Sequence, residues 1–233
     1  MSCLRKTSYI NGLDEILCGG FVDNSTILIS GKAGSGKTNI CLQSLFEAAK
    51  NGETCAYVSM LSESKEKILN TLSNFDFFDQ SILDSGKMSI QSVDSDIICK
   101  GDFSIFEYIN ENILTLNPDR VVIDPITVFE EIDSTFEERQ FRGCELRTFA
   151  RNLFSEFEER NIMLIITAEA SENPINTCKW SYMVDTILTL ENVINGNKMH
   201  RYLELIKARR SDYIPGKHAY SMTRNGVRVI SQY

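Results

Sequence analysis

The chain has 233 residues and a formal net charge of −8, with 42% hydrophobic and 24% charged residues. These proportions are ordinary for a globular protein. A chain of this length can bury about 70% of its unfolded surface, so it needs neither a disulfide nor a structural metal to fold. The acidic balance argues against a general affinity for nucleic acid or anionic membranes.

Targeting and redox features predict a cytoplasmic protein. The first residues, MSCLRKTSYINGLDE, lack the apolar core of a signal peptide. No apolar run approaches the roughly 18 residues that a membrane span needs. The seven cysteines are scattered and form no C-x-x-C pair. That spacing predicts reduced thiols rather than a zinc site or a disulfide framework.

The first two-thirds of the chain alternates between strand-like and helix-like segments. Short apolar, β-branched runs indicate buried strands, and apolar residues at helical spacing indicate helices. In chain order we expect a strand at 26–30, a helix at 37–50, a strand at 54–60, helices at 64–75 and 105–116, a strand at 120–124, a helix at 136–160 and a strand at 162–167. The strand at 120–124 lacks polar alternation, as in a parallel sheet covered on both faces.

The last third changes pattern. From residue 184 onward, strand-like segments are separated by short turns at Asn195-Gly196 and Asn225-Gly226, which are hairpin signals. We therefore expect an α/β fold, with a mostly parallel central sheet flanked by helices and a C-terminal antiparallel β extension. Ligands of such sheets bind at the carboxyl ends of the strands.

A phosphate-binding loop lies at that end of the first long strand. Residues 31–38 read GKAGSGKT, follow the strand at 26–30 and open the helix at 37–50, which is the context that G-x-x-x-x-G-K-[ST] requires. Its backbone N–H groups and the helix N-terminus would face phosphate oxygens. We expect Lys37 to bridge the β- and γ-phosphates and the Thr38 hydroxyl to hold Mg²⁺. The expected nucleotide-binding residues are Gly31, Lys32, Ala33, Gly34, Ser35, Gly36, Lys37, Thr38 and Asn39.

An acidic residue ends the strand at 120–124. Asp124 directly follows three apolar residues, and a carboxylate in that position is costly unless it has a partner. Holding Mg²⁺, mostly through water, would supply one. The alternative interpretation is a turn aspartate before Pro125. With Thr38, Asp124 forms our candidate metal site.

Together these motifs resemble the KaiC-like branch of the RecA superfamily of P-loop ATPases over nearly the whole chain. Residues 10–20, INGLDEILCGG, are similar to the family's N-terminal GLDEILxGG segment, and residues 120–124 to its Walker B strand. Residues 203–209, LELIKAR, are similar to its LEIxKxRG strand, and residues 220–227 to its closing hairpin. The resemblance implies a RecA-like P-loop NTPase fold. We expect residues 1–233 to form one such domain, which binds ATP and Mg²⁺.

The resemblance also implies assembly. Family members form rings, often hexamers, with ATP held between neighbouring subunits. On that mapping, Lys207 and Arg209 reach the neighbour's nucleotide as charge-assisted donors, Ser211 and Thr223 make further contacts in trans, and Ser73 contacts nucleotide after the second strand. Without the resemblance, Lys207 and Arg209 would be interpreted as a solvated charge pair on an edge strand.

The main departure from the family concerns catalysis. Leu61 and Ser62 stand where the family has two glutamates that activate the attacking water, and neither side chain can take a proton from water. A missing general base costs about 10²–10⁴ in rate. Glu63 could substitute if the loop is shifted, and Glu130 and Glu131 are other candidates. We name Glu63 and Lys37 as candidate catalytic residues and expect slow or absent hydrolysis.

Two further departures lie elsewhere. Arg210 replaces the glycine that the family usually has after K-x-R, and glycine allows close backbone approach. The added bulk and charge would change how the neighbour's nucleotide sits. Pro125 replaces a small hydroxyl residue.

DNA binding is a weaker interpretation. The loop after Asp124 is acidic over residues 127–138, and a phosphate backbone would be repelled there. The loop at 169–182 holds Lys179 and Trp180, one cation beside one stacking aromatic residue, together with Glu169 and Glu172.

Three functions therefore stay open. The leading hypothesis is a regulatory or signalling ATPase whose nucleotide controls assembly or the binding of an unknown protein partner. The second is a recombinase-related DNA-repair accessory protein. The third is a non-hydrolysing scaffold that holds ATP as a structural ligand.

Overall fold

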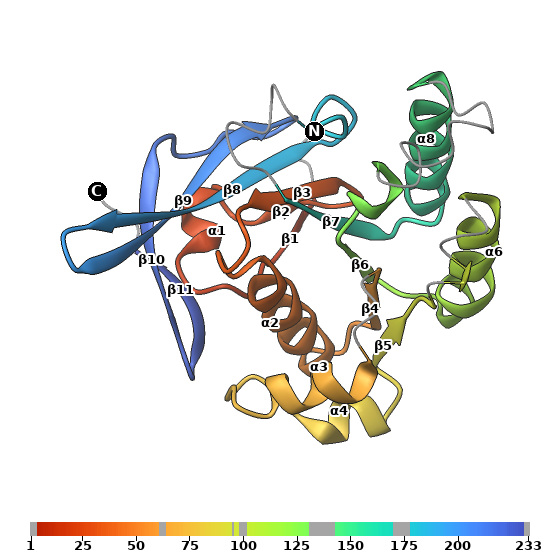
Figure 1. Ribbon diagram of the computed structural model, residues 1–233, viewed down its shortest axis with the longest axis horizontal. Helices are drawn as coiled ribbons and strands as arrows, with labels where there is room; N and C mark the ends of the chain where they lie inside the picture. The colour runs from red at the N-terminus through yellow and green to blue at the C-terminus, as the bar shows by residue number, and fades with distance from the viewer. Residues whose placement is uncertain are drawn as a thin grey trace.

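The computed structural model describes residues 4–60, 64–94, 96–97, 102–130, 143–169 and 178–230. The strands are β1 (Arg5–Lys6), β2 (Phe21–Val22), β3 (Thr26–Gly31), β4 (Cys55–Ser59), β5 (Met88–Ser92), β6 (Arg120–Asp124), β7 (Met163–Glu169), β8 (Thr186–Asn195), β9 (Lys198–Ala208), β10 (Lys217–Thr223) and β11 (Gly226–Ile230). The helices are α1 (Leu13–Ile16), α2 (Lys37–Lys50), α3 (Lys65–Leu72), α4 (Gln80–Asp84), α6 (Asp102–Asn112) and α8 (Gly143–Glu159), with the short 3₁₀ helix η1 (Leu114–Leu116). Figure 1 shows how these elements are arranged.

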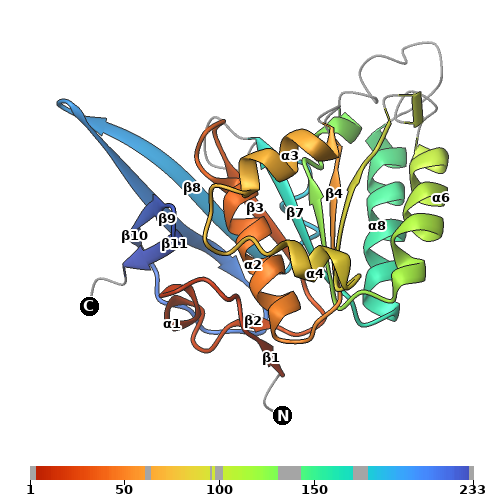
Figure 2. The ribbon, with the colours of Figure 1, turned by 90° about the horizontal axis from the view of Figure 1, so that it is seen from below.

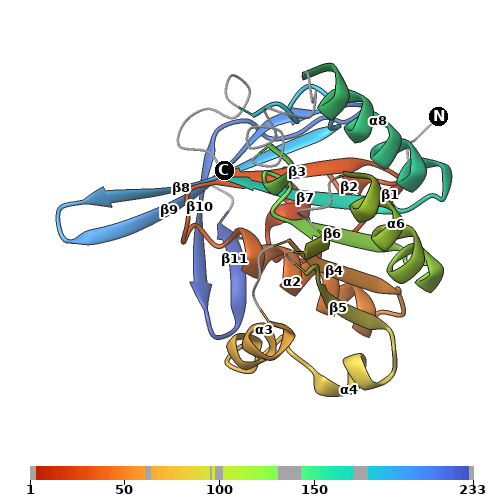
Figure 3. The same ribbon diagram turned by 45° about the vertical axis from the view of Figure 1, so that its right-hand side comes forward.

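Nine of the described strands form one mixed sheet in the order β11-β10-β9-β8-β3-β7-β6-β4-β5, and β1 pairs with β2 in a small second sheet. Within this order, the neighbouring strands β8, β3, β7, β6, β4 and β5 are mutually parallel. From β8 to β11 the sheet continues antiparallel. The β8–β9 hairpin extends beyond the helical layers (Figure 3). No helix in the described ranges is long and apolar enough to cross a bilayer.

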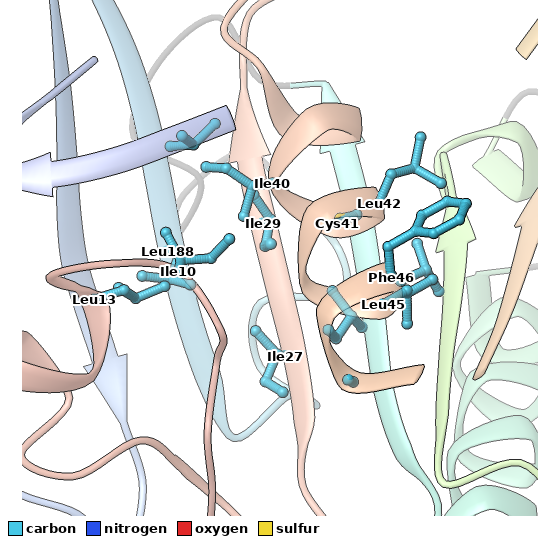
Figure 4. Packing of buried hydrophobic residues seen from close by; sticks show 14 of the residues in the cluster. Ile10, Leu13, Ile27, Ile29, Ile40, Cys41, Leu42, Leu45, Phe46 and Leu188 are labelled. Atoms are coloured by element: carbon cyan, nitrogen blue, oxygen red, sulfur yellow. The ribbon is translucent and has the colours of Figure 1, made fainter. Parts of the chain in front are cut away.

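Helices cover both faces of the parallel part of the sheet. Alternate residues of a strand point to opposite faces, and β3 shows this directly: Ile27 and Ile29 belong to one apolar cluster and Leu28 to the other. The first cluster includes side chains of α2 and the N-terminal segment, and the second includes side chains of α6 and α8. Figures 1 and 2 show α2, α3 and α4 on one side of the sheet and α6 and α8 on the other. Figure 4 shows the cluster between β3 and α2.

The expected α/β class, parallel core and antiparallel extension are confirmed. The helix expected at 37–50 coincides with α2, and the strand expected at 120–124 coincides with β6. The helix expected at 105–116 is divided into α6 and η1, and the one expected at 136–160 is described only from 143 onward as α8. Sequence reasoning missed β5, the β1–β2 pair, α1 and α4.

The N-terminal segment closes the edge of the fold. Gly12 has a φ of +81°, and a Cβ there would lie 2.2 Å from the carbonyl oxygen of Val229 in β11. The N–H of Val229 donates to the carbonyl of Asn11 at 2.8 Å. Gly20 has a similar constraint, because its Cβ would lie 2.5 Å from the carbonyl oxygen of Lys6. These glycines therefore let the chain pass against β11 and β1.

A partly buried ion pair joins β6 to the segment before β4. Arg120 is fully buried, and its guanidinium donates to both carboxylate oxygens of Glu53, at 2.6 and 2.8 Å. The same guanidinium lies 5.1 Å from the ring centroid of Tyr9. Removing one partner of such a pair destabilises the fold, because the remaining charge stays in a low-dielectric site.

Replacing Glu53 by Gln is expected to lower the free energy of unfolding by about 3 kcal/mol, since Arg120 loses its counter-charge. Urea denaturation measures the change. Glu47→Gln is the matched control, because Glu47 pairs with Lys50 on α2 with side chains 32% and 28% exposed. Such surface pairs contribute less than about 1 kcal/mol. Equal losses in the two variants would contradict the role assigned to the Arg120–Glu53 pair.

Candidate functional site

The loop between β3 and α2 has the backbone of a phosphate cradle. Gly34 and Gly36 have φ values of +75° and +94°, in the region that only glycine adopts readily. A Cβ at Gly36 would lie 3.1 Å from the Sδ of Met222, and one at Gly31 would lie 2.4 Å from the carbonyl oxygen of Leu190. The loop therefore favours glycine at Gly34 for conformation, at Gly31 for space and at Gly36 for both.

The loop offers hydrogen-bond donors that fit an anion. The N–H groups of Ala33, Gly34, Gly36, Lys37 and Thr38 find no acceptor within the described residues. Consecutive free N–H groups at a helix N-terminus form an anion-binding concavity. The buried Ser35 hydroxyl also lacks a partner among these residues. This donor set fits a polyphosphate.

The Lys37 ammonium folds over the mouth of the loop. It donates to the carbonyl oxygens of Gly31 at 2.7 Å and Lys32 at 3.1 Å, and the residue is 8% exposed. Burial lowers the pKa of Lys37, and the charges of Glu169 and Asp124 oppose that shift. A phosphate oxygen is a stronger acceptor than a neutral carbonyl for an ammonium group. Lys37 is thus placed to exchange its carbonyl partners for phosphate.

Asp124 lies where four elements meet. Its Oδ2 accepts hydrogen bonds from the Thr38 hydroxyl at 2.7 Å and the Tyr57 hydroxyl at 2.8 Å, and its Oδ1 accepts one from the Thr167 hydroxyl. Asp124 is only 5% exposed. Burial, and then the nearby Asp124 charge, raises the pKa of Tyr57, so the phenol remains a donor. The Asp124–Pro125 peptide bond is cis.

The pair formed by Thr38 and Asp124 fits a magnesium ion. A hydroxyl and a carboxylate that share a hydrogen bond present oxygen ligands at one point, and Mg²⁺ prefers oxygen ligands with several waters retained. The described residues contain no group of three or more His, Cys, Asp or Glu side chains able to hold a metal. These two residues would therefore hold the ion together with phosphate oxygens and water.

Four residues beside the loop were not identified as site residues from the sequence. Asn192 of β8 donates to the Gly34 carbonyl at 3.3 Å, and Tyr220 of β10 donates to the Ser35 carbonyl. Met222 of β10 contacts the side-chain amide of Asn39 at 2.9 Å. Glu169, at the carboxyl end of β7, pairs in register with Gly31. No local pattern signals these contacts, because most partners lie more than 150 positions apart.

The proposed trans cations lie at the opposite end of the sheet from the loop of their own chain. Lys207 pairs with Ile187, which pairs with Leu28 in β3, whereas the loop begins at Gly31. Three residues of strand separate these levels by about 10 Å. The Lys207 ammonium donates to the carbonyls of Ser181 at 2.8 Å and Val184 at 2.7 Å.

The surroundings of Lys207 include a second cation. Arg209 donates to the carbonyl of Tyr182 at 3.1 Å. Burial, and then the charge of Arg209, lowers the pKa of Lys207. The charge of Asp185 opposes that lowering. The direct hydrogen-bond acceptors of the two cations are nevertheless neutral carbonyls, so a bound anion would stabilise them further.

Three other residues were predicted to contact nucleotide, and they lie in three different places. The Ser211 hydroxyl accepts a hydrogen bond from Arg5 at 2.7 Å, near the trans cations. Thr223 ends β10 directly after Met222, so it lies near the loop of its own chain. Ser73 caps the end of α3, and its hydroxyl donates to the Asn70 carbonyl at 2.8 Å rather than to the loop.

Candidate catalytic carboxylates are only partly described. Leu61, Ser62 and Glu63 lie outside the described residues, and so does Glu131. Glu130 lies in a helical segment after β6 and is the last described residue before residue 143. The roles proposed for these residues therefore remain predictions.

Arg210 gives a physical reason for the glycine that the family has at this position. Its φ is +59°, a left-handed conformation that glycine adopts without strain. The guanidinium lies 3.5 Å from the carboxylate of Asp185, which gives the arginine a partner. The departure from the family is thus accommodated in the same turn.

Trp180 is not available to stack on a base. The residue is fully buried, and its ring lies 6.1 Å from the rings of Phe129 and Phe154. The sequence suggested it as a stacking aromatic residue, whereas the structure uses it as core. This removes the aromatic part of the argument for DNA binding.

Gly34→Ala is expected to weaken Mg-ATP binding by about tenfold, equivalent to about 1.4 kcal/mol, because relieving the strain moves the loop N–H groups. Gly52→Ala is the matched control. Gly52 follows the other end of α2, has a φ of +97° and, like Gly34, has open space for a Cβ. Both variants should lose about 1 kcal/mol of stability. ATP titration and thermal unfolding measure the two effects, and unchanged affinity in Gly34→Ala would argue against the cradle.

Comparison with known proteins gives a consistent family. The family model described as "ATPase: KaiC" matches residues 6–233. The chain is 27% identical to the circadian clock oscillator protein KaiC of Picosynechococcus sp. over 231 residues and 27% identical to that of Nostoc sp. over 230 residues, covering 95% of this chain and 43% of each relative. The circadian clock oscillator protein KaiC 1 of Synechocystis sp. is 25% identical with the same coverage. The chain spans less than half the length of these curated relatives. It belongs to the KaiC ATPase family.

Proposed function

We propose that this chain binds ATP and Mg²⁺ at residues 31–38 and Asp124. The contact that carries the proposal is the 2.7 Å hydrogen bond between the Thr38 hydroxyl and the Asp124 carboxylate, directly beside the phosphate cradle. It brings the two expected metal ligands together from α2 and β6. The loop N–H groups would hold the phosphates, and Lys37 would neutralise their charge. Mg²⁺, when bound, would polarise the phosphate oxygens and stabilise charge on the leaving group.

Hydrolysis in this proposal is slow or absent. Binding uses the loop, Lys37, Thr38 and Asp124, which all belong to one chain. Cleavage also needs a group that takes a proton from water, and Leu61 and Ser62 cannot supply it. Binding and cleavage are separable, because only groups that act in the transition state accelerate the reaction. Glu63 is the nearest carboxylate in the sequence that could take this role.

Lys37→Ala is expected to weaken Mg-ATP binding by at least about tenfold, since it removes a charge-assisted bond to phosphate. Calorimetric titration measures the affinity, and phosphate release measures turnover for the wild type, Lys37→Ala and Glu63→Gln. The wild type should turn over well below the typical enzyme rate of about 10 per second. Turnover at that rate, unaffected by Glu63→Gln, would contradict both the slow hydrolysis and the role of Glu63.

Assembly is the second part of the proposal. Lys207 lies about 10 Å along the sheet from the level of its own loop, and Arg209 follows two residues further away, so a nucleotide bound by a neighbouring copy is the natural acceptor for them. Ring formation would place these cations against the phosphates of the next subunit. Because nucleotide would then contact two chains, its binding would favour the assembled state by mass action. Nucleotide would thus regulate assembly, and through it a partner-binding surface.

Mg-ATP is expected to raise the average mass of the protein in multi-angle light scattering. Arg209→Ala should reduce this rise, since it removes one of the two cations offered to the neighbour's nucleotide. Lys198→Ala is the matched control, because Lys198 is an exposed cation at the other end of β9. If Arg209→Ala and Lys198→Ala assemble like the wild type, the trans role fails. An unchanged mass with Mg-ATP would contradict nucleotide-dependent assembly.

The clock activity named for the relatives is not part of this proposal. The chain covers 43% of those proteins, so a role of the whole relative does not follow from the match. The DNA-repair interpretation lost its stacking residue when Trp180 proved to be buried. A salt-dependent shift of single-stranded DNA would restore that interpretation.

A further inference from the structure

The phosphate cradle is held from outside by the C-terminal antiparallel extension. The side-chain amide of Asn192, from β8, donates to the Gly34 carbonyl at 3.3 Å. The hydroxyl of Tyr220, from β10, donates to the Ser35 carbonyl. Within the described residues, these are the donors to the two carbonyls at the centre of the loop. The part of β8 that extends beyond its pairing with β3, together with β10, therefore contacts the loop backbone.

These contacts constrain which way the loop peptides face. The bond to the Ser35 carbonyl is buried, whereas the bond to the Gly34 carbonyl is exposed. A donor that fixes a carbonyl also fixes the orientation of the N–H in the same peptide unit. The carbonyl of Ser35 shares its peptide with the N–H of Gly36, and that of Gly34 shares its peptide with the N–H of Ser35. Holding both carbonyls outward therefore limits rotation of the loop. This is preorganisation, which strengthens binding by lowering its ordering cost.

The donors are suited to a fixed role. Tyr220 is buried, and burial raises its pKa to about 12, so its hydroxyl keeps its proton throughout the physiological range. Met222, two residues further along β10, contacts Asn39 in the first turn of α2. Gln43, one turn along α2, accepts from the N–H of Val227 at 2.6 Å and donates to the carbonyl of the same residue at 3.2 Å. The β10–β11 hairpin is thus tied to the loop and to the helix that follows it.

We propose that Asn192 and Tyr220 are positioning residues for phosphate binding, which set the conformation of the loop through the carbonyls of Gly34 and Ser35. The inference rests on the proposed function, since it concerns the affinity of the same loop for polyphosphate. It goes further by assigning part of that affinity to strands β8 and β10. It also links the loop to β9, which lies between those strands and carries Lys207.

The test uses Mg-tripolyphosphate, which has the phosphates of a nucleotide but no base or ribose, and so reports on the cradle alone. Calorimetric titration compares the wild type, Tyr220→Phe, Asn192→Ala and the double variant. Tyr220→Phe leaves a buried carbonyl without its donor and is expected to weaken binding by about 5-fold. Asn192→Ala is expected to cause a smaller loss, because its bond to the Gly34 carbonyl is exposed and water can replace it, and the double variant should lose most. Lys37→Ala locates the binding at the loop.

Tyr213→Phe is the matched control, because the Tyr213 hydroxyl also donates to a backbone carbonyl, that of Ile206 at 3.5 Å, away from the loop. Thermal unfolding of each variant identifies the temperature at which all are folded, and affinities are compared there. A merely structural role would lower the unfolding midpoint and leave the affinity of the folded protein unchanged. Asn192→Ala keeps the test available if Tyr220→Phe does not fold.

The outcomes separate the inference from the proposed function. Weaker tripolyphosphate binding in Tyr220→Phe and Asn192→Ala, with Tyr213→Phe like the wild type, supports the positioning role. Wild-type affinity in both variants, alongside a loss in Lys37→Ala, overturns the positioning role and leaves the nucleotide site standing. A wild-type protein that binds neither tripolyphosphate nor Mg-ATP overturns both.

Discussion

The buried carboxylate of Asp124 is the constraint on which the site depends. A carboxylate with 5% of its surface exposed is stable only when its oxygens accept hydrogen bonds. Here the donors are Thr38, Tyr57 and Thr167, from α2, β4 and β7. Because the three donors come from different elements, satisfying one carboxylate fixes the first turn of α2 against the ends of the parallel strands. The cradle that precedes α2 is positioned by the same contacts.

The two parts of the sheet contribute differently to that site. The parallel strands bring their carboxyl ends together. The loop after β3, Asp124 at the end of β6 and Glu169 at the end of β7 therefore lie at the same end of the sheet. The antiparallel strands supply side chains that hold the loop from the side. The same extension carries Lys207 to the far end of the sheet. One continuous sheet therefore carries the phosphate-binding loop at one end of its strands and a basic group toward the other end. Copies that pack with these two ends in contact would bring the loop and the basic group together.

The sequence was sufficient where the physical cause is local. The glycines of the loop, the Asn51-Gly52 stop of α2 and the apolar run before Asp124 predicted α2 and β6 with their boundaries. The β8–β9 and β10–β11 turns followed from Asn-Gly pairs. It was insufficient where the cause is tertiary. The contacts of Asn192 and Tyr220 join positions that lie far apart, the burial of Trp180 depends on Phe129 and Phe154, and β5 lacks the apolar run that marks the other parallel strands.

The hydrogen-bond acceptors of the three cations indicate how nucleotide binding would change the molecule. The cations Lys37, Lys207 and Arg209 all donate to neutral carbonyls in this structure. Exchanging a neutral carbonyl for an anionic phosphate oxygen adds the attraction of opposite charges to each hydrogen bond and strengthens it. The gain at Lys37 needs only nucleotide, whereas the gain at Lys207 and Arg209 needs nucleotide and a second copy. On the proposed function, nucleotide binding and assembly would therefore favour each other, and this linkage requires no cleavage of ATP.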